Sequence, residues 1–218
     1  MMGAGESEVK KRCQWICLPI LLIIFGCERP NLTGVEFEKI DTSQDPRQTP
    51  YTTRETISRR IKGGSVSITS QAEYKISGVV VSRKSYSDDW GGEISPVDLA
   101  IAWGRLADPD SDRYVTFGHG YRWYRYRWKE EGPFNGSDII THSSNNHTIP
   151  AGENVGRALK AIRRGGRIVL EGYLVNLKGI YKGREVSWVT SLSRKDTGNG
   201  SCELFYVSKV RIDTKVYE

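Results

Sequence analysis

The strongest constraint on the fold is a series of segments with strand-like alternation that begins near residue 64. In residues 73–82 and 167–175, apolar side chains alternate with polar ones, and valine, isoleucine and tyrosine recur. Similar segments, separated by glycine-containing turns, cover residues 66–68, 114–129, 185–193 and 202–213. β-Branched and aromatic residues at a period of two favour strands. The sequence therefore predicts a strand-rich, mostly antiparallel domain.

Two short helices are expected to interrupt these strands. Ser95 and Pro96 are typical of a helix start, since serine caps the first turn and proline fits the first helical position, so one helix is predicted over 95–106. The other is predicted over 153–164 and ends at a glycine pair. The expected fold class is α+β. A small barrel similar to OB-fold and SH3-like barrels, with a bulge or bend at Gly172, is one form that satisfies the pattern.

The N-terminal region has the organisation of an export signal. Three basic residues at 10–12 precede an apolar run at 13–26. That run is shorter than the ~20 residues of a membrane-spanning helix. Gly26 directly before Cys27 resembles the lipobox of bacterial lipoproteins, although a bulky phenylalanine stands in front of the glycine. In that family the signal peptide is removed before the cysteine, and the new N-terminal residue is acylated.

This resemblance implies that residues 1–26 are a lipoprotein signal peptide and that Cys27 is the lipidation site. Two or three acyl chains, palmitate among them, anchor a protein stably to a membrane. Glu28 follows the cysteine in place of the aspartate associated with inner-membrane retention, which favours the outer membrane. The expected location is the bacterial cell envelope with the domain in the periplasm. An ordinary signal peptide and an uncleaved anchor are the alternatives.

Residues 27–62 are predicted to be a flexible tether, and residues 63–218 to be the β-rich globular domain. The tether is polar, contains several prolines and shows no sustained hydrophobic period. Removal of residues 1–26 lowers the formal net charge from +6 to +5, because that segment holds three basic and two acidic residues. A mildly basic chain suits anionic surfaces such as lipid headgroups or cell-wall polymers, and does not require nucleic acid.

The segment Tyr121–Lys129 is the richest candidate for binding, because aromatic and basic residues interleave along it. Aromatic faces beside guanidinium groups suit stacking on bases or sugars, together with a phosphate or carboxylate. The predicted binding residues are Tyr121, Arg122, Trp123, Arg125 and Arg127. The competing interpretation packs Tyr124, Tyr126 and Trp128 into the core while the arginines reach solvent.

Cys202 with His142 or His147 forms the candidate site of a thiol- or histidine-dependent hydrolase. A nucleophilic thiol needs a neighbouring imidazole that favours its ionised form. The simpler interpretation is that the cysteine is a small buried apolar residue and that the histidines belong to a hydrogen-bonded polar loop. With His119 there are three histidines, but their spacing is not that of a metalloprotease helix. No metal and no other cofactor is predicted.

The segments 141–151 and 196–204 resemble those of a family of uncharacterised bacterial proteins, which also carries an aromatic-rich segment like 121–128. The resemblance implies that residues 73–212 form one unit, and it implies no activity. The predicted function is a membrane-anchored envelope lipoprotein with a non-catalytic binding or assembly module, whose partner is an envelope protein or a glycan. The hydrolase and an OB-like nucleic-acid-binding protein are the alternatives.

Overall fold

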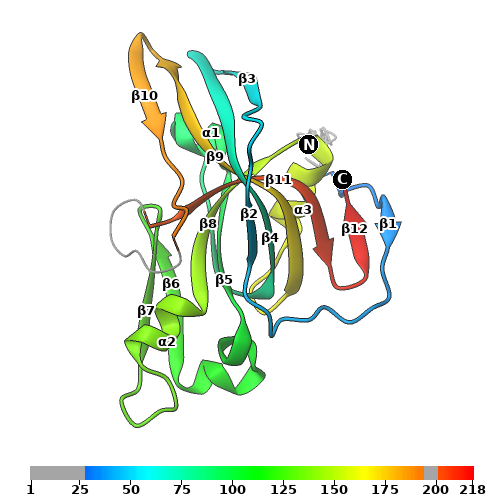
Figure 1. Ribbon diagram of the computed structural model, residues 1–218, viewed down its shortest axis with the longest axis vertical. Helices are drawn as coiled ribbons and strands as arrows, with labels where there is room; N and C mark the ends of the chain where they lie inside the picture. The colour runs from blue at the N-terminus through cyan, green and yellow to red at the C-terminus, as the bar shows by residue number, and fades with distance from the viewer. Residues whose placement is uncertain (1–27, 194–200) are drawn as a thin grey trace, which may run out of the picture.

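A computed structural model describes residues 28–193 and 201–218. The predicted signal peptide and Cys27 lie outside the described residues, as does most of the turn before Cys202. The predicted α+β class is confirmed, since antiparallel strands make up most of the regular structure and the helices are few and short (Figure 1). Within the described residues, no helix is long and apolar enough to cross a membrane.

Five strands carry the central sheet, and their pairings return to the strand from which they start. They are β4 (Gly64–Ser85), β5 (Val97–Ala102), β8 (Ser143–Pro150), β9 (Arg167–Tyr181) and β11 (Glu203–Ile212). β4 pairs with both β5 and β9, β5 pairs with β8, and β11 pairs with both β8 and β9. The β8–β11 pairing is parallel and the other four are antiparallel.

The main core lies inside this cycle of strands because β4, β5, β9 and β11 turn alternate apolar residues toward it. Tyr74 and Ile76 of β4 meet Leu99 of β5 and Phe205 of β11 there, and the rings of Tyr74 and Phe205 meet edge to face at 4.9 Å. Each such side chain contributes roughly 1.5–3 kcal/mol by burial. The helix α3 (Glu153–Ala161), which confirms the second predicted helix, packs Val155, Ala158 and Leu159 into the same core.

Gly172 allows the close approach of β9 to β11. Its φ is +155°, and a Cβ atom there would lie 2.0 Å from the backbone oxygen of Tyr206. Opposite it, the register shifts between Val207 and Lys209, so Ser208 is the extra residue of a bulge. The irregularity predicted at Gly172 is therefore confirmed, with the additional residue on the partner strand.

The predicted helix over 95–106 is wrong. Residues 97–102 form the strand β5, and only a 3-10 turn, Gly104–Ala107, follows. Every residue of β5 is buried, because one face lies in the core and the other is covered by further elements of the chain. A strand buried on both faces loses the polar alternation that marks a strand. The serine and proline that were interpreted as a helix cap instead precede this strand.

The predicted tether over 27–62 is also wrong for the part that the structure describes. This segment of the chain forms the strands β1 (Gly34–Val35), β2 (Arg47–Pro50) and β3 (Thr56–Ile61). β2 and β3 pair with β4, and β1 pairs with the C-terminal strand β12 (Lys215–Tyr217). The pairings of β1 and β2 join residues far apart in the chain, whereas β3 forms a tight hairpin with β4 from mostly exposed residues, so a local hydrophobic period reveals none of them. The segment belongs to the folded domain.

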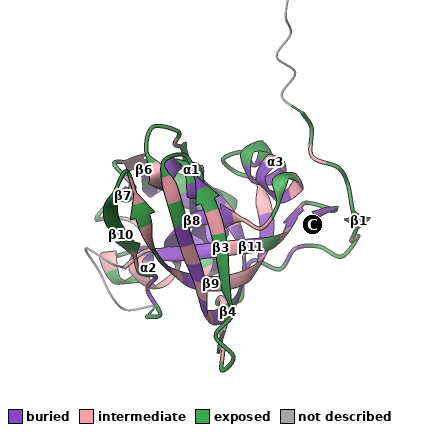
Figure 2. Ribbon diagram, turned by 90° about the horizontal axis from the view of Figure 1, so that it is seen from above, coloured by how far each residue is buried: buried purple, intermediate pink, exposed green. Residues whose placement is uncertain are grey.

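The remaining elements cover the outside of the five-stranded cycle. The strands β6 (Val115–Gly120) and β7 (Trp123–Trp128) form a separate hairpin within the strand segment predicted over 114–129, and they turn at Tyr121 and Arg122. Figure 2 shows that β8 is mostly buried, whereas β7 and β10 (Arg184–Trp188) carry exposed residues at the periphery. The short helices are α1 (Trp90–Ile94) and α2 (Gly136–Thr141).

Candidate binding surface and buried polar clusters

One face of the β6–β7 hairpin is exposed, and it presents aromatic and cationic side chains together. We call this surface the β7 face; its residues are Tyr121, Trp123, Arg125, Arg127 and Lys129. Tyr121 is 89% exposed and Trp123 38% exposed. Within the described part of the chain, no carboxylate pairs with Arg125, Arg127 or Lys129. Four of the five predicted binding residues therefore lie together at the surface.

Glycines on the neighbouring strand leave this surface uncovered. Across the hairpin, Trp123 faces Gly120 and Arg125 faces Gly118. A Cβ atom added to Gly118 would meet nothing within 4 Å, so the space beside the arginine is open. Glycine in a strand interior weakens the strand and often marks a place where a ligand approaches closely. The side chains of Trp123 and Arg125 are thus left uncovered, because glycines stand where the neighbouring strand would usually place a side chain.

The opposite face of β7 packs against the domain. Tyr124 and Tyr126 lie against Phe117 with ring centroids 6.4 Å apart in each case. Burial raises the pKa of Tyr124 to about 12. The rings join a cluster with Ala100 and Ala102, on the outer side of β5. The core-packing interpretation is thus correct for Tyr124 and Tyr126, while Trp128 is 42% exposed.

Arg122 is not part of the exposed surface. Its Nη1 atom lies 2.8 Å from Asp98 Oδ1 and donates to the backbone oxygen of Ser95 at 2.9 Å. The guanidinium carbon lies 3.8 Å from the ring centroid of Tyr86 and 5.4 Å from that of Trp188. The prediction that Arg122 binds a ligand is therefore not supported by its position. Its role is to hold the hairpin on the domain.

The hairpin turn itself holds two residues in the left-handed region. Tyr121 has a φ of 51° and Arg122 a φ of 69°. Two-residue turns of this kind prefer asparagine and glycine, because other side chains are strained there. Non-glycine residues in this conformation cost of order 1–3 kcal/mol each and cluster at functional sites. Here the turn separates the two side chains, so that Tyr121 projects into solvent while Arg122 reaches inward.

His147 belongs to the same buried cluster as Arg122. Its Nδ1 atom lies 3.0 Å from Asp98 Oδ2, and its ring centroid lies 4.6 Å from that of Trp188. The fully buried carboxylate lies between the Arg122 guanidinium and the His147 imidazole. The helix expected over 95–106 did not identify Asp98 as part of a buried cluster, because the residue belongs to the strand β5. A hydrophilic residue inside an otherwise apolar strand was the signal that could have identified it.

Cys202 lies in a second polar cluster, which contains His119 instead of the predicted histidines. The side-chain amide of Asn145 donates to Cys202 Sγ at 3.4 Å. The Oδ1 atom of that asparagine lies 2.9 Å from His119 Nε2, and His119 Nδ1 lies 2.8 Å from Ser82 Oγ. Burial lowers the pKa of His119. The amide of Asn145 stands between the thiol and the imidazole, so this geometry shows no direct contact through which His119 could activate the thiol.

His142 lies elsewhere, at the end of α2. Its Nδ1 atom lies 2.9 Å from the backbone oxygen of Asp138 and 3.0 Å from Thr141 Oγ1. The structure thus gives each of the three histidines a different local partner. In the described ranges, no group of three or more histidine, cysteine, aspartate or glutamate side chains is arranged to hold a metal ion.

Comparisons with known proteins give no independent assignment. No family model, no curated protein and no solved structure matches the chain.

Proposed function

We propose that this protein is a lipid-anchored module of the bacterial cell envelope, which binds an anionic glycan through the β7 face. The observation that carries this proposal is the exposed row of Tyr121, Trp123, Arg125 and Arg127 beside two glycines of β6. Aromatic rings stack on the apolar faces of sugars, and guanidinium groups form charge-assisted hydrogen bonds with carboxylate or phosphate. A glycan with acidic groups offers sugar faces to the aromatic rings and acidic groups to the guanidinium groups.

The connectivity of the fold supports a binding role. We infer that the cycle of β4, β5, β8, β9 and β11 is a small OB-like barrel, because α3 lies between the third and fourth of these strands and the third and fifth are parallel. OB-folds bind oligosaccharides and oligonucleotides on the outer face of their second and third strands. Here those strands are β5 and β8, and the β6–β7 hairpin covers part of that face. Fold alone does not fix the ligand, so the choice of a glycan depends on the side chains of the hairpin itself.

The predicted anchor selects a glycan over a nucleic acid. A domain held at the membrane through Cys27 meets the acidic polymers of the envelope. The OB-like nucleic-acid-binding alternative requires arginines in an exposed groove with aromatic faces, and Arg122 points away from such a groove. We do not propose the hydrolase, because His147 lies against Asp98 and His142 against Asp138.

The test is a calorimetric titration of the full protein, extracted from membranes in neutral detergent. The ligands are an oligogalacturonate as the anionic oligosaccharide, a neutral malto-oligosaccharide of the same length and an oligodeoxythymidylate. The account predicts saturable binding of the oligogalacturonate, which weakens about tenfold or more in Trp123→Ala and in Arg125→Ala/Arg127→Ala. The matched control is Lys182→Ala/Arg184→Ala, in an exposed turn elsewhere. Tighter binding of the oligodeoxythymidylate would show that the ligand is a nucleic acid and not a glycan. Equal binding of the oligogalacturonate by all variants would show that the β7 face is not the binding site.

A further inference from the structure

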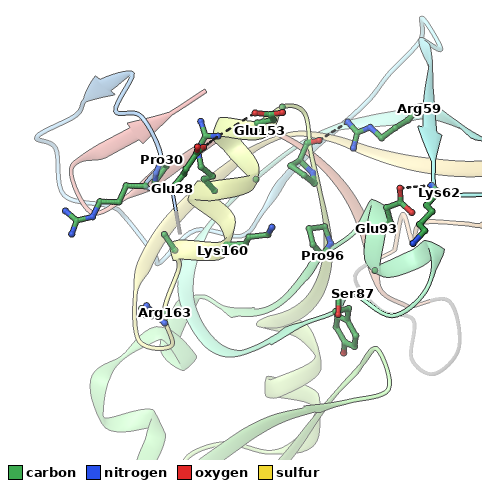
Figure 3. A pocket seen from close by; sticks show the side chains of 18 residues that line it. Glu28, Pro30, Arg59, Lys62, Ser87, Glu93, Pro96, Glu153, Lys160 and Arg163 are labelled. Carbon is green, nitrogen blue, oxygen red and sulfur yellow. Dashed lines mark hydrogen bonds and ion pairs between the residues drawn. The ribbon is translucent and has the colours of Figure 1, made fainter. Parts of the chain in front are cut away.

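A groove of about 1120 Å³ lies between α3, α1 and the turn that joins β3 to β4 (Figure 3). Small and rigid residues form much of its wall: Pro30, Pro96, Pro150, Gly152, Gly156 and Ala161. It is separate from the β7 face, since none of the residues of that face lines it. The groove is therefore a second concave surface, distinct from the proposed glycan site.

The charged side chains of the groove are predominantly cationic. Six basic and three acidic residues line it. Arg59 donates to the backbone oxygen of Pro150 at 2.8 Å, and Arg157 lies 3.4 Å from Glu28. Among the described residues, the other four basic side chains have no carboxylate partner. They are Arg29, Lys62, Lys160 and Arg163.

Two of these unpaired cations extend into the groove from opposite walls. Figure 3 shows Lys160 extending into it from α3 and Lys62 from the opposite wall, with Arg163 at the lower rim. Behind Arg163, burial and then the charge of Arg163 lower the pKa of Arg83, whose Nε atom is buried without a partner in the described part of the chain. An anion bound between Lys160 and Arg163 would relieve this crowding of like charges.

The polypeptide enters the domain at this groove. Glu28 lines it beside Arg157, and Asn31 fixes the entering segment to α3 through two hydrogen bonds with Asn154. Glu28, the first described residue, directly follows Cys27 in the sequence. A lipid on Cys27 therefore places the bilayer surface next to these basic residues. Figures 1 and 2 both show the β6–β7 hairpin on the side of the molecule away from α3.

We infer that this groove binds the phosphate of an anionic phospholipid headgroup and so docks the domain on the membrane that holds its anchor. Lys160, Lys62 and Arg163 contact the phosphate, while the proline and alanine wall accommodates the glycerol and the first part of the acyl chains. Basic residues next to an anionic leaflet add to membrane attachment, and this contribution falls with salt. The inference rests on the proposed anchor at Cys27. It leaves the β7 face directed away from the bilayer and available to a polymer.

The test measures how fast a water-soluble acetylating reagent modifies each lysine of the full protein in lipid nanodiscs. One set of discs contains phosphatidylcholine alone, and the other also contains phosphatidylglycerol. The expected result is that phosphatidylglycerol slows acetylation of Lys62 and Lys160 about threefold or more, because a phosphate contact removes the free amine. Lys178 and Lys182, on the β9–β10 hairpin, are internal controls whose rates stay unchanged. Mass spectrometry of peptides reports all four sites in one sample.

The Arg163→Glu variant tests whether the protection arises in the groove, and it leaves both labelled lysines unchanged. It is expected to abolish the protection of Lys160 by phosphatidylglycerol, whereas Arg184→Glu preserves it. Equal labelling in both kinds of disc, or protection that survives Arg163→Glu, would overturn the inference. So would equal protection by free glycerol phosphate in phosphatidylcholine discs, since the site would then serve a soluble phosphate ester. Arg125→Glu/Arg127→Glu must retain the protection, so that failure of the glycan proposal and failure of this one are separate results.

Discussion

Arg122 Nη1 lies 2.8 Å from Asp98 Oδ1, and this ion pair joins the tip of the β6–β7 hairpin to the outer side of β5. The aspartate side chain is fully buried and that of Arg122 is 20% exposed. The guanidinium also stacks on Tyr86, so the same residue satisfies a buried charge and positions the turn. The position of the exposed β7 face consequently depends on this buried ion pair.

Removal of this cation is expected to destabilise the domain strongly. In Arg122→Ala, the carboxylate of Asp98 is left buried with one partner fewer, and breaking a buried pair in this way costs about 3–5 kcal/mol. The free energy of unfolding is measured by urea denaturation, and hydrogen exchange over 115–128 reports the loosened hairpin. Arg125→Ala is the matched control, because that side chain is exposed and its loss changes stability by less than about 0.5 kcal/mol. Equal effects of the two substitutions would show that the pair does not hold the hairpin.

A side chain at Gly118 is expected to separate ligand binding from stability. Gly118→Val places a branched side chain in the open space beside Arg125. Since glycine in a strand costs roughly 0.5–1 kcal/mol relative to alanine, and valine favours strands, the variant should be at least as stable as the natural protein. It should bind the anionic oligosaccharide more weakly, because it covers the surface on which the sugar lies. Unchanged affinity in a folded Gly118→Val protein would contradict the proposed ligand position.

Gly172→Ala is expected to disrupt the closing pair of strands. The new Cβ atom would lie 2.0 Å from the backbone oxygen of Tyr206, so β9 and β11 have to separate or bend. We expect a loss of at least about 2 kcal/mol in the free energy of unfolding, from the clash and the backbone strain together. Thermal and urea denaturation measure it. Gly118→Ala, at an open strand position, serves as the control and should be neutral or slightly stabilising.

His119 is expected to make stability fall as the pH decreases below 6.5. Burial lowers its pKa below 6.5 in the folded protein, so the unfolded chain binds more protons in that range. The contribution of His119 is fully present above pH 6.5 and is lost progressively toward the lower pKa of the folded state. Urea denaturation across this range should show a steeper decline for the natural protein than for His119→Gln. Parallel curves would contradict this assignment.

The elements predicted correctly from the sequence are those with a strong local signal. The alternation over 167–175 predicts the strand β9, and the glycine pair after α3 predicts the end of that helix. The strand β5 was missed because both of its faces are covered, by the core on one side and by the hairpin on the other. The strand β3 was missed although it forms a tight hairpin with β4 through Lys62 and Gly63, because its residues are mostly exposed and show no apolar alternation.

The candidate site divides in the same way. The β7 face could be predicted because strand alternation separates its aromatic and basic side chains from those that pack. The position of Arg122 could not, since it depends on a left-handed turn and on Asp98, whose strand was assigned as a helix. The relation of Cys202 to His119 through Asn145 joins three distant segments, which only the folded structure brings together.

The claim on which the proposed function most depends is that Cys27 anchors the chain in the envelope, because both proposed partners are found there. It is tested most directly by the intact mass of the protein purified from membranes, compared with a Cys27→Ser variant. The account predicts a chain that begins at residue 27 and carries two or three acyl chains, and a variant that lacks them. An unmodified chain that begins at Met1 would contradict the account and would return the β7 face to the nucleic-acid-binding alternative.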